Sequence, residues 1–224
     1  MAEKTYEKVT GFIKENIISG VYGPGSKLPT ERELALRLGI SRNSVREGLR
    51  VMENIGVITS HHGSGNYISL NFDDMMSEML SFMYFLKSIN EQQIIEFRWK
   101  IEESALKLAN KYITKEEKEI LSRALANLEK AASEEERTKY DWIIHQTIVN
   151  ASRNDFLIAN YRAFTSFIES HIKMMRSHII HGMQTARQLE LTHRHIVQGL
   201  LQNDLRLSMA GLREHFDYID LYRK

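Results

Sequence analysis

The chain has 224 residues, of which 26% are charged and 42% hydrophobic, and its formal net charge is +1 at pH 7. This length predicts one or two domains. Cysteine is absent from the sequence, which excludes disulfides, thiolate metal sites and a cysteine nucleophile. No apolar run approaches the roughly 20 residues that cross a bilayer, and the first residues lack the apolar segment of a signal peptide. We therefore expect a cytoplasmic protein with no membrane partner.

The chain begins with an apolar pattern of helical period that ends at Gly20. The residues of this pattern are Tyr6, Val9, Phe12, Ile13 and Ile17. Residues 20–29, GVYGPGSKLP, then predict a loop with a short extended piece, because they combine glycine and proline.

Two helices joined by a tight turn are predicted between Pro29 and Met52. Thr30 and Glu33 have the spacing of a capping box that starts the first helix. Gly39 suits its C-terminal turn, and Ser41 caps the second helix two residues later. This is the pattern of a helix-turn-helix, which can place its second helix in a DNA major groove.

The second helix carries two different faces. One face is apolar and should pack on the core, whereas the other is an arginine stripe at positions i, i+4 and i+8. The apolar residues are Val45, Leu49 and Met52, and the stripe is Arg42, Arg46 and Arg50. Residues 1–69 carry nine Lys or Arg and seven Asp or Glu, so the positive charge must be concentrated locally.

Two short strands are predicted in residues 57–69, VITSHHGSGNYIS, on either side of Gly63 and Gly65. Helices followed by a hairpin form a winged helix-turn-helix. Residues 5–69 resemble the DNA-binding domain of the GntR family of bacterial transcription regulators. The resemblance rests on three motifs, which are Gly25–Leu34, Leu38–Glu47 and Gly63–Ile68.

The resemblance implies a set of residues that contact double-stranded operator DNA. Arg42 and Arg46 would read base edges or clamp guanine acceptors. Residues on or near phosphates would be Arg32, Ser41, Asn43 and Ser44. In the wing, His62 aligns with a histidine that touches DNA in the family and stands directly before Gly63. A solvated wing histidine is the alternative for His62.

From Leu70 onward the sequence contains no proline and its patterning is helical. We predict a DNA-binding domain at 1–69, a linker at 70–74 and an all-helical domain at 75–224. The predicted helices are 74–88, 90–112, 115–132, 135–152, 155–181, 184–202 and 204–221. Short connections favour an antiparallel bundle, so the fold class is mainly α with one hairpin. Four methionines, Met75, Met76, Met79 and Met83, are expected to fill gaps in the core.

Four ligand-type residues stand out in the helical region. Asp141 and His145 are one helical turn apart and share a face, and His193 and His215 lie on the last two predicted helices. One aspartate and three histidines suit a borderline divalent metal. The alternative is that these are ordinary polar residues of the core or surface.

The helical region also resembles the FCD effector domain of the FadR subfamily. The matching text runs from Glu96-Phe97-Arg98 and Ile101-Glu102 through Asp141–His145, His193–Ile196 and Met209–His215. In metal-binding members, an Asp/His pair and two later histidines form the site, which implies Asp141, His145, His193 and His215 as ligands here. We expect zinc, with nickel, manganese or iron as other candidates. Thr192 departs from the family pattern, in which glutamate is frequent, and His195 should point away from the site.

Arg98 allows two interpretations. In the resembling domain this arginine faces the ligand cavity, where its guanidinium could bind a carboxylate in bidentate fashion. Alternatively it forms a structural salt bridge with Glu102, four residues later.

Together these features predict a homodimeric transcription regulator, not an enzyme, that binds a palindromic operator. Its helical domain would hold a metal that coordinates a small carboxylate or hydroxy acid. A metal-dependent hydrolase or oxygenase with an appended DNA-binding domain is the competing hypothesis, because such a ligand set could activate water. In a third interpretation the bundle is purely a dimerisation module. The sequence determines neither the effector nor whether the protein represses or activates.

Overall fold

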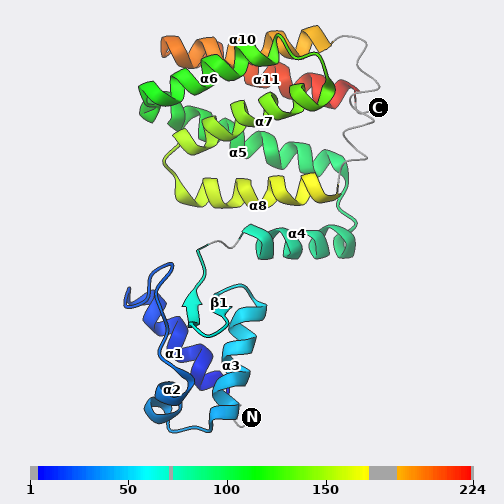
Figure 1. The fold of residues 1–224 in the computed structure, drawn as a ribbon. Coiled ribbons are helices and arrows are strands. Elements are labelled where there is room, and N and C mark those ends of the chain that lie inside the picture. Colours follow the sequence, from blue (N-terminus) through cyan, green and yellow to red (C-terminus); the bar gives the residue numbers. More distant parts are fainter. Residues whose placement is uncertain (1–4, 71–72, 172–185, 223–224) are drawn as a thin grey trace. The chain divides into compact units, whose positions relative to one another are not determined.

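The computed structural model describes residues 5–70, 73–171 and 186–222 (Figure 1). The chain forms two compact units that divide between Met76 and Ser77. Helix α4, Asp73–Lys87, begins inside the predicted linker and runs across this division.

The first unit has three helices and a hairpin among its described residues. They are α1 (Glu7–Ile18), α2 (Glu31–Leu38), α3 (Arg42–Asn54), β1 (Ile58–His61) and β2 (Gly65–Ile68). The strands are antiparallel, with Ile58 opposite Ile68 and His61 opposite Gly65. The order of helices followed by a hairpin confirms the predicted winged helix-turn-helix.

The helix boundaries follow the capping residues in the sequence. Thr30 and Glu33 form the predicted capping box, in which each side chain accepts a hydrogen bond from the other residue's backbone N–H. Gly39 ends α2 with a φ of 63°, a left-handed conformation that glycine adopts without strain. The Ser41 hydroxyl accepts the Ser44 N–H and so begins α3.

The core of this unit is apolar. Val9, Ile13, Leu34 and Val45 have no exposed surface, and Leu49 and Met52 are also buried, as the helical spacing predicts. Helices α1 and α3 pack closely at Gly48, where an added Cβ would lie 2.5 Å from the Val9 Cβ.

The second unit is all-helical among its described residues, which confirms the predicted fold class. After α4 come α5 (Glu91–Tyr112), α6 (Lys115–Leu128), α7 (Glu134–Ala151), α8 (Asp155–His171), α10 (Ala186–Gln202) and α11 (Leu205–Tyr222). Helix α6 ends earlier than predicted, because residues after Leu128 form a turn. The end of the predicted helix 155–181 and the start of 184–202 lie outside the described residues.

Helices α5 and α7 lie in the middle of this bundle (Figure 1). Helix α8 packs on them from one side, whereas α6 packs on α7 and α11 packs on α5. Helix α10 then packs against both α6 and α11. The largest core cluster draws residues from all of these helices except α8, among them Leu106, Leu121, Ile144, Ile196 and Leu212.

The prediction for the methionines of α4 was wrong at two positions. Met79 and Met83 are 61% and 45% exposed, whereas Leu80 and Tyr84 of the same helix pack against Ile94. Helical spacing located an apolar face on α4 but did not tell which side of the helix is covered.

Candidate metal centre and nucleic-acid interface

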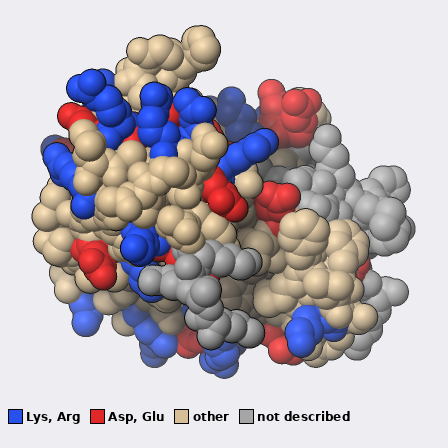
Figure 2. All heavy atoms as spheres, turned by 90° about the horizontal axis from the view of Figure 1, so that it is seen from below, with Lys and Arg blue, Asp and Glu red and all other residues tan. Residues whose placement is uncertain are grey.

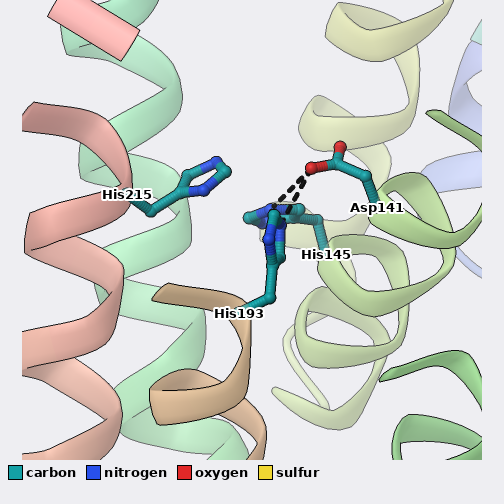
Figure 3. Close-up of side chains that lie close together, drawn as sticks. All are labelled: Asp141, His145, His193 and His215. Carbon is teal, nitrogen blue, oxygen red and sulfur yellow. Dashed lines mark hydrogen bonds and ion pairs between the residues drawn. The ribbon is translucent and has the colours of Figure 1, made fainter. Parts of the chain in front are cut away.

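The structure brings together the four residues predicted as metal ligands. One potential ligand atom from each of Asp141, His145, His193 and His215 lies within 4.8 Å of the others. Figure 3 shows the side chains pointing toward one another, with Asp141 and His145 coming from α7, His193 from α10 and His215 from α11. Residues that are 74 positions apart in the sequence therefore form one cluster.

The contacts within the cluster are close. The His193 Nε2 lies 2.9 Å from Asp141 Oδ1, and the His145 Nε2 lies 3.3 Å from His193 Nε2. The His145 Nε2 is also 3.8 Å from Asp141 Oδ1. All three histidines are buried, whereas the Asp141 side chain remains 26% exposed. Nitrogen and oxygen lone pairs thus converge on one small volume at the edge of the core.

Local helix geometry explains half of this arrangement. Asp141 and His145 are four residues apart on α7, so their side chains lie one above the other. The other half depends on how closely α10 and α11 approach. A Cβ at Gly211 would lie 2.6 Å from the His195 Cβ and 2.8 Å from the Ile196 N. Only glycine permits this approach, which sets the separation between the helices that carry His193 and His215.

A second glycine supports the same helix pair. A Cβ at Gly199 would lie 2.5 Å from the backbone N of Ser208, and the Ser208 hydroxyl donates to the Ile196 carbonyl at 3.1 Å. Small residues therefore bring α10 and α11 together along their length, and not only beside the cluster.

The surroundings of the cluster favour the protonation states in which its side chains can bind a metal. Burial lowers the pKa of His215 well below its ordinary value, and the neighbouring His193 and His145 lower it further. Burial of Asp141 would raise its pKa, but the three histidines outweigh burial and hold the pKa well below its usual range. A neutral imidazole and an ionised carboxylate are the forms that bind a metal.

One buried atom shows that these residues fit a metal ion. The His215 Nε2 is buried and makes no hydrogen bond to any described group, although buried polar atoms are normally paired. The His215 Nδ1 lies 3.4 Å from Thr192 Oγ1, so an Nδ1–H can point to Thr192 and leave the Nε2 lone pair for a metal. Thr192, the departure from the family pattern, thus still contacts a ligand histidine.

Other predictions near the cluster can be compared with the structure. The His195 Nδ1 lies 3.3 Å from Glu214 on the outer side, and His195 is not among the clustered ligands, as predicted. For Arg98, the structural salt bridge is present, with Nε 2.6 Å from Glu102 Oε1. Burial lowers the Arg98 pKa, but the Glu102 carboxylate outweighs burial and holds it above its ordinary value.

Two residues of the site were missed from the sequence. The sequence indicates Glu102 as part of the FCD motif and as a partner of Arg98, but not that its Oε2 lies 2.5 Å from His145 Nδ1. Tyr161 donates its hydroxyl to Glu102 Oε1 at 3.0 Å and was not considered at all. Burial would raise the pKa of Glu102, but Arg98 and His145 lower it to about 2. No spacing in the sequence links Glu102 to His145 or to Tyr161, because these contacts cross from α5 to α7 and from α5 to α8.

A cleft of about 410 Å³ lies along α5 and α11. Its lining includes Trp99, Arg213, Phe216 and Asp217, but none of the four clustered ligands. Phe216 is the residue next to His215, and the rings of the two are 5.4 Å apart. The cleft is therefore separate from the metal centre, although the two share the wall made by α11.

The predicted DNA-contacting residues lie at the surface of the first unit. Arg42 and Arg46 have side chains that are 60% and 59% exposed. Both contact Glu31 of α2, the first at 3.5 Å and the second, through Nε, at 2.9 Å. Arg32, Ser41, Asn43, His62 and Gly63 are exposed as well. Figure 2 shows several Lys and Arg side chains side by side along the upper edge of the face that it displays, with others scattered over the rest of that face.

Two of the side chains that are predicted to lie on or near phosphates, Ser41 and Ser44, interact with each other within the protein. The Ser41 hydroxyl accepts the Ser44 N–H, and the two hydroxyl groups lie 3.0 Å apart. Ser44 is half-buried.

In the wing, Gly63 has a φ of 75°, a conformation that favours glycine in the turn between β1 and β2.

Comparison with known proteins identifies the family. The pattern of the bacterial regulatory proteins of the gntR family matches residues 5–68, and that of the FCD domain matches residues 93–218, more than half of the chain. The chain belongs to the GntR family of regulators and carries an FCD domain. Its domain composition agrees with the FadR type of GntR regulator.

Curated relatives of this GntR chain are named as operon regulators. It is 26% identical over 227 residues to the putative L-lactate dehydrogenase operon regulatory protein of Escherichia coli, covering 98% of this chain and 84% of the relative. It is 25% identical over 216 residues to the Glc operon transcriptional activator of Escherichia coli, covering 93% and 85%. The family match, with which these names agree, shows a transcription regulator rather than an enzyme.

The fold also matches a solved GntR structure. Streptococcus agalactiae GntR superposes with a TM-score of 0.67 at 20% identity, covering 98% of this chain and all of that one. Within the described residues, no helix has the length and apolar character required to cross a membrane.

Proposed function

We propose that this GntR regulator is a homodimer that binds a palindromic operator and responds to a small organic acid held by a metal ion. The observation that carries the proposal is the cluster of Asp141, His145, His193 and His215, in which the buried His215 Nε2 has no hydrogen-bond partner in the described part of the chain. Residues 1–69 would form the DNA-binding domain, 70–74 the linker and 75–224 the effector and dimerisation domain. The protein would act in the cytoplasm, where its DNA lies.

In the DNA-binding domain, α3 would enter the major groove. Arg42 and Arg46 project from it into solvent and could bind guanine O6 and N7 in bidentate fashion. Arg32, Ser41, Asn43 and Ser44 would lie on or near phosphates, with His62 and Gly63 of the wing against the backbone or minor groove. A homodimer would read two half-sites, which explains a palindromic operator.

In the effector domain, zinc is the first candidate, with nickel, manganese or iron as alternatives, because three imidazoles and a carboxylate suit these ions. Four protein ligands occupy every coordination position of a tetrahedral ion, but they leave two coordination positions open on an octahedral ion. A carboxylate or hydroxy acid could occupy both. The name of one relative refers to L-lactate dehydrogenase, and lactate is such an acid.

Arg98 could neutralise a second oxygen group of the acid. In the described part of the chain it is bound to Glu102 through Nε, and its terminal nitrogens make no hydrogen bond to a protein group. Its guanidinium also lies 5.5 Å from the centre of the Phe216 ring. A salt bridge and a ligand contact are therefore compatible for this residue, since they would use different nitrogens.

Thermal melting tests the effector site. A ligand that binds only the folded state stabilises it, by roughly 2.7 kcal/mol at a hundredfold excess over its dissociation constant. We expect at least one of lactate, gluconate, malate and citrate to raise the melting temperature of metal-loaded protein. The shift should vanish after chelation and shrink strongly in Arg98→Ala.

Arg194→Ala is a matched control, because Arg194 follows a ligand histidine but pairs with Glu129 at the surface. It should keep the full acid-dependent shift. An acid that stabilises chelated and metal-loaded protein equally would show that the metal is not part of the effector site.

A further inference from the structure

Glu102 is a buried carboxylate with three polar side chains around it. It is 1% exposed and lies on α5. Its Oε2 lies 2.5 Å from His145 Nδ1, and its Oε1 accepts from Arg98 Nε at 2.6 Å and from the Tyr161 hydroxyl at 3.0 Å. One side chain therefore contacts both a candidate metal ligand and the candidate acid-binding arginine.

We propose that Glu102 is a positioning residue that fixes the tautomer of His145 for metal binding and holds Arg98 beside the same centre. The proposal rests on the proposed metal site and assigns a role to a residue that is not itself a ligand. It explains why a carboxylate is buried here, at a position that is otherwise expensive for a charge.

The tautomer follows from the two nitrogens of His145. Nδ1 faces Glu102, whereas Nε2 faces the cluster, 3.3 Å from His193 Nε2 and 3.8 Å from Asp141 Oδ1. A carboxylate can only accept, so Nδ1 must carry the proton and the Nε2 lone pair is directed to the metal. A carboxylate behind a ligand histidine also makes the imidazole a stronger donor.

The surroundings of Glu102 make an amide a poor substitute. Arg98 and Tyr161 both donate to Oε1, so the carbonyl oxygen of a glutamine would stay on their side. Its NH₂ group would then face His145 Nδ1 and require a lone pair there. The His145 proton would move to Nε2, where it blocks the metal. Glu102→Gln thus changes few atoms but reverses the direction of one hydrogen bond.

The shared carboxylate also joins two parts of the site. Oε1 holds the guanidinium through Nε, and Oε2 holds the metal-facing imidazole. A bound acid that contacts Arg98 and the metal would therefore contact two groups already fixed by one residue. Loss of Glu102 should therefore disturb both the metal and the orientation of Arg98.

Metal affinity tests the role directly, with Zn²⁺ alone as the probe and a chelator as competitor. We expect Glu102→Gln to bind Zn²⁺ about 10- to 100-fold more weakly than the natural chain, as is typical when such a partner is lost. Glu103→Gln is the matched control, because Glu103 pairs with Lys100 and Lys107 at the surface. Glu103→Gln should bind Zn²⁺ as the natural chain does.

A second measurement does not depend on the metal. Long-range ¹H–¹⁵N spectra of metal-free protein report which ring nitrogen carries the proton. We expect the Nδ1–H form for His145 in the natural chain and a shift toward the Nε2–H form in Glu102→Gln. If that variant does not fold, Glu102→Asp keeps the charge with a shorter reach and should give an intermediate loss of Zn²⁺ affinity.

The outcomes separate the two proposals. A natural chain with the Nδ1–H tautomer that fails to bind Zn²⁺ would remove the metal centre and, with it, this role for Glu102. A natural chain that binds Zn²⁺ while Glu102→Gln binds it equally well would leave the metal centre intact and overturn the role of Glu102 alone. An Nε2–H form in the natural chain would also overturn it.

Discussion

The two units of the chain place their candidate functional groups in opposite environments. In the first unit, Arg42 and Arg46 are exposed and the core beneath them is apolar. In the second unit, His145, His193 and His215 are buried and lie against the hydrophobic cluster that includes Ile144 and Phe216. Function and folding are therefore separable in the first unit, whereas in the second they depend on the same residues.

This contrast follows from what each site must bind. DNA is a large polyanion that is read from outside, so its partners must be in solvent. A metal and a small acid need converging ligands that several helices hold in place. Substitution of a DNA-contacting residue in the first unit should weaken binding without changing stability. Substitution of a metal ligand in the second unit should weaken both binding and stability.

The largest effect is expected at the metal ligands. His193→Ala or His215→Ala should lower metal content sharply from a value near one ion per chain, since each removes a coordinating nitrogen. Elemental analysis of purified protein measures this. His195→Ala is the control and should keep full occupancy, because that ring pairs with Glu214 outside the cluster. Full occupancy in both ligand variants would mean that the metal lies elsewhere.

Next is the glycine contact between α10 and α11. Gly211→Ala should reduce the free energy of unfolding by about 1–3 kcal/mol through overpacking, because its Cβ would meet backbone atoms. It should also weaken metal binding by moving His215 away from His193. Denaturant unfolding and a Zn²⁺ titration measure the two effects.

Gly11→Ala is the matched control for this substitution. Gly11 lies inside α1, and no described atom outside its chain neighbours and the backbone of that helix lies within 4 Å of an added Cβ. Alanine is the better helix former by about 1 kcal/mol, so this variant should be at least as stable as the natural chain. Equal stability losses in the two variants would contradict the close-packing argument.

In the first unit, Arg46→Ala should weaken specific operator binding by roughly 1–3 kcal/mol if Arg46 makes a bidentate base contact. Stability should change by less than about 0.5 kcal/mol, since the residue is exposed. A gel-shift titration at fixed salt and a melting curve measure the two quantities. Operator affinity that stays unchanged would remove Arg46 from the set of base-reading residues.

The smallest effect is expected at the cap of α2. Thr30→Ala should reduce the free energy of unfolding by about 1 kcal/mol, because it removes the acceptor of the Glu33 N–H. Thr10→Ala in α1 is the control, since the Thr10 hydroxyl donates to the Glu7 carbonyl of its own helix and caps no helix end. Unfolding by denaturant measures both, and equal values would contradict the capping role.

The same cap predicts a pH dependence. The backbone N–H of Thr30 lowers the pKa of Glu33 below its ordinary value of 4.5, and the Thr30 hydroxyl lowers it further. A group with a lowered pKa stabilises the fold above its ordinary pKa and loses that contribution as the pH falls. Alanine keeps the backbone N–H, so only the hydroxyl's share of this contribution differs between the two chains. The stability difference between the natural chain and Thr30→Ala should therefore shrink in part below about pH 4.5, which melting curves across pH would show.

Much of the first unit could be predicted from sequence, because its determinants are local. Thr30, Gly39 and Ser41 act within three or four residues of themselves. The ligand set of the second unit depended on a family resemblance, since spacing alone relates only Asp141 to His145. Glu102 and Gly211 could not be found, because one contacts His145 across 43 positions and the other matters only where two helices touch. The covered side of α4 likewise depends on tertiary packing.

The pairing of Arg42 and Arg46 with Glu31 bears on how the protein would search for its operator. If these arginines read bases as proposed, each must first exchange a carboxylate of its own chain for DNA. Random DNA offers mainly phosphates, whose attraction Glu31 opposes through its own negative charge. A guanine in register offers two acceptors to one guanidinium and competes with Glu31 more effectively. The Glu31 carboxylate would then shorten the residence time of the protein on unrelated DNA more than its residence time on the operator. Glu31 would thereby reduce non-specific binding relative to specific binding.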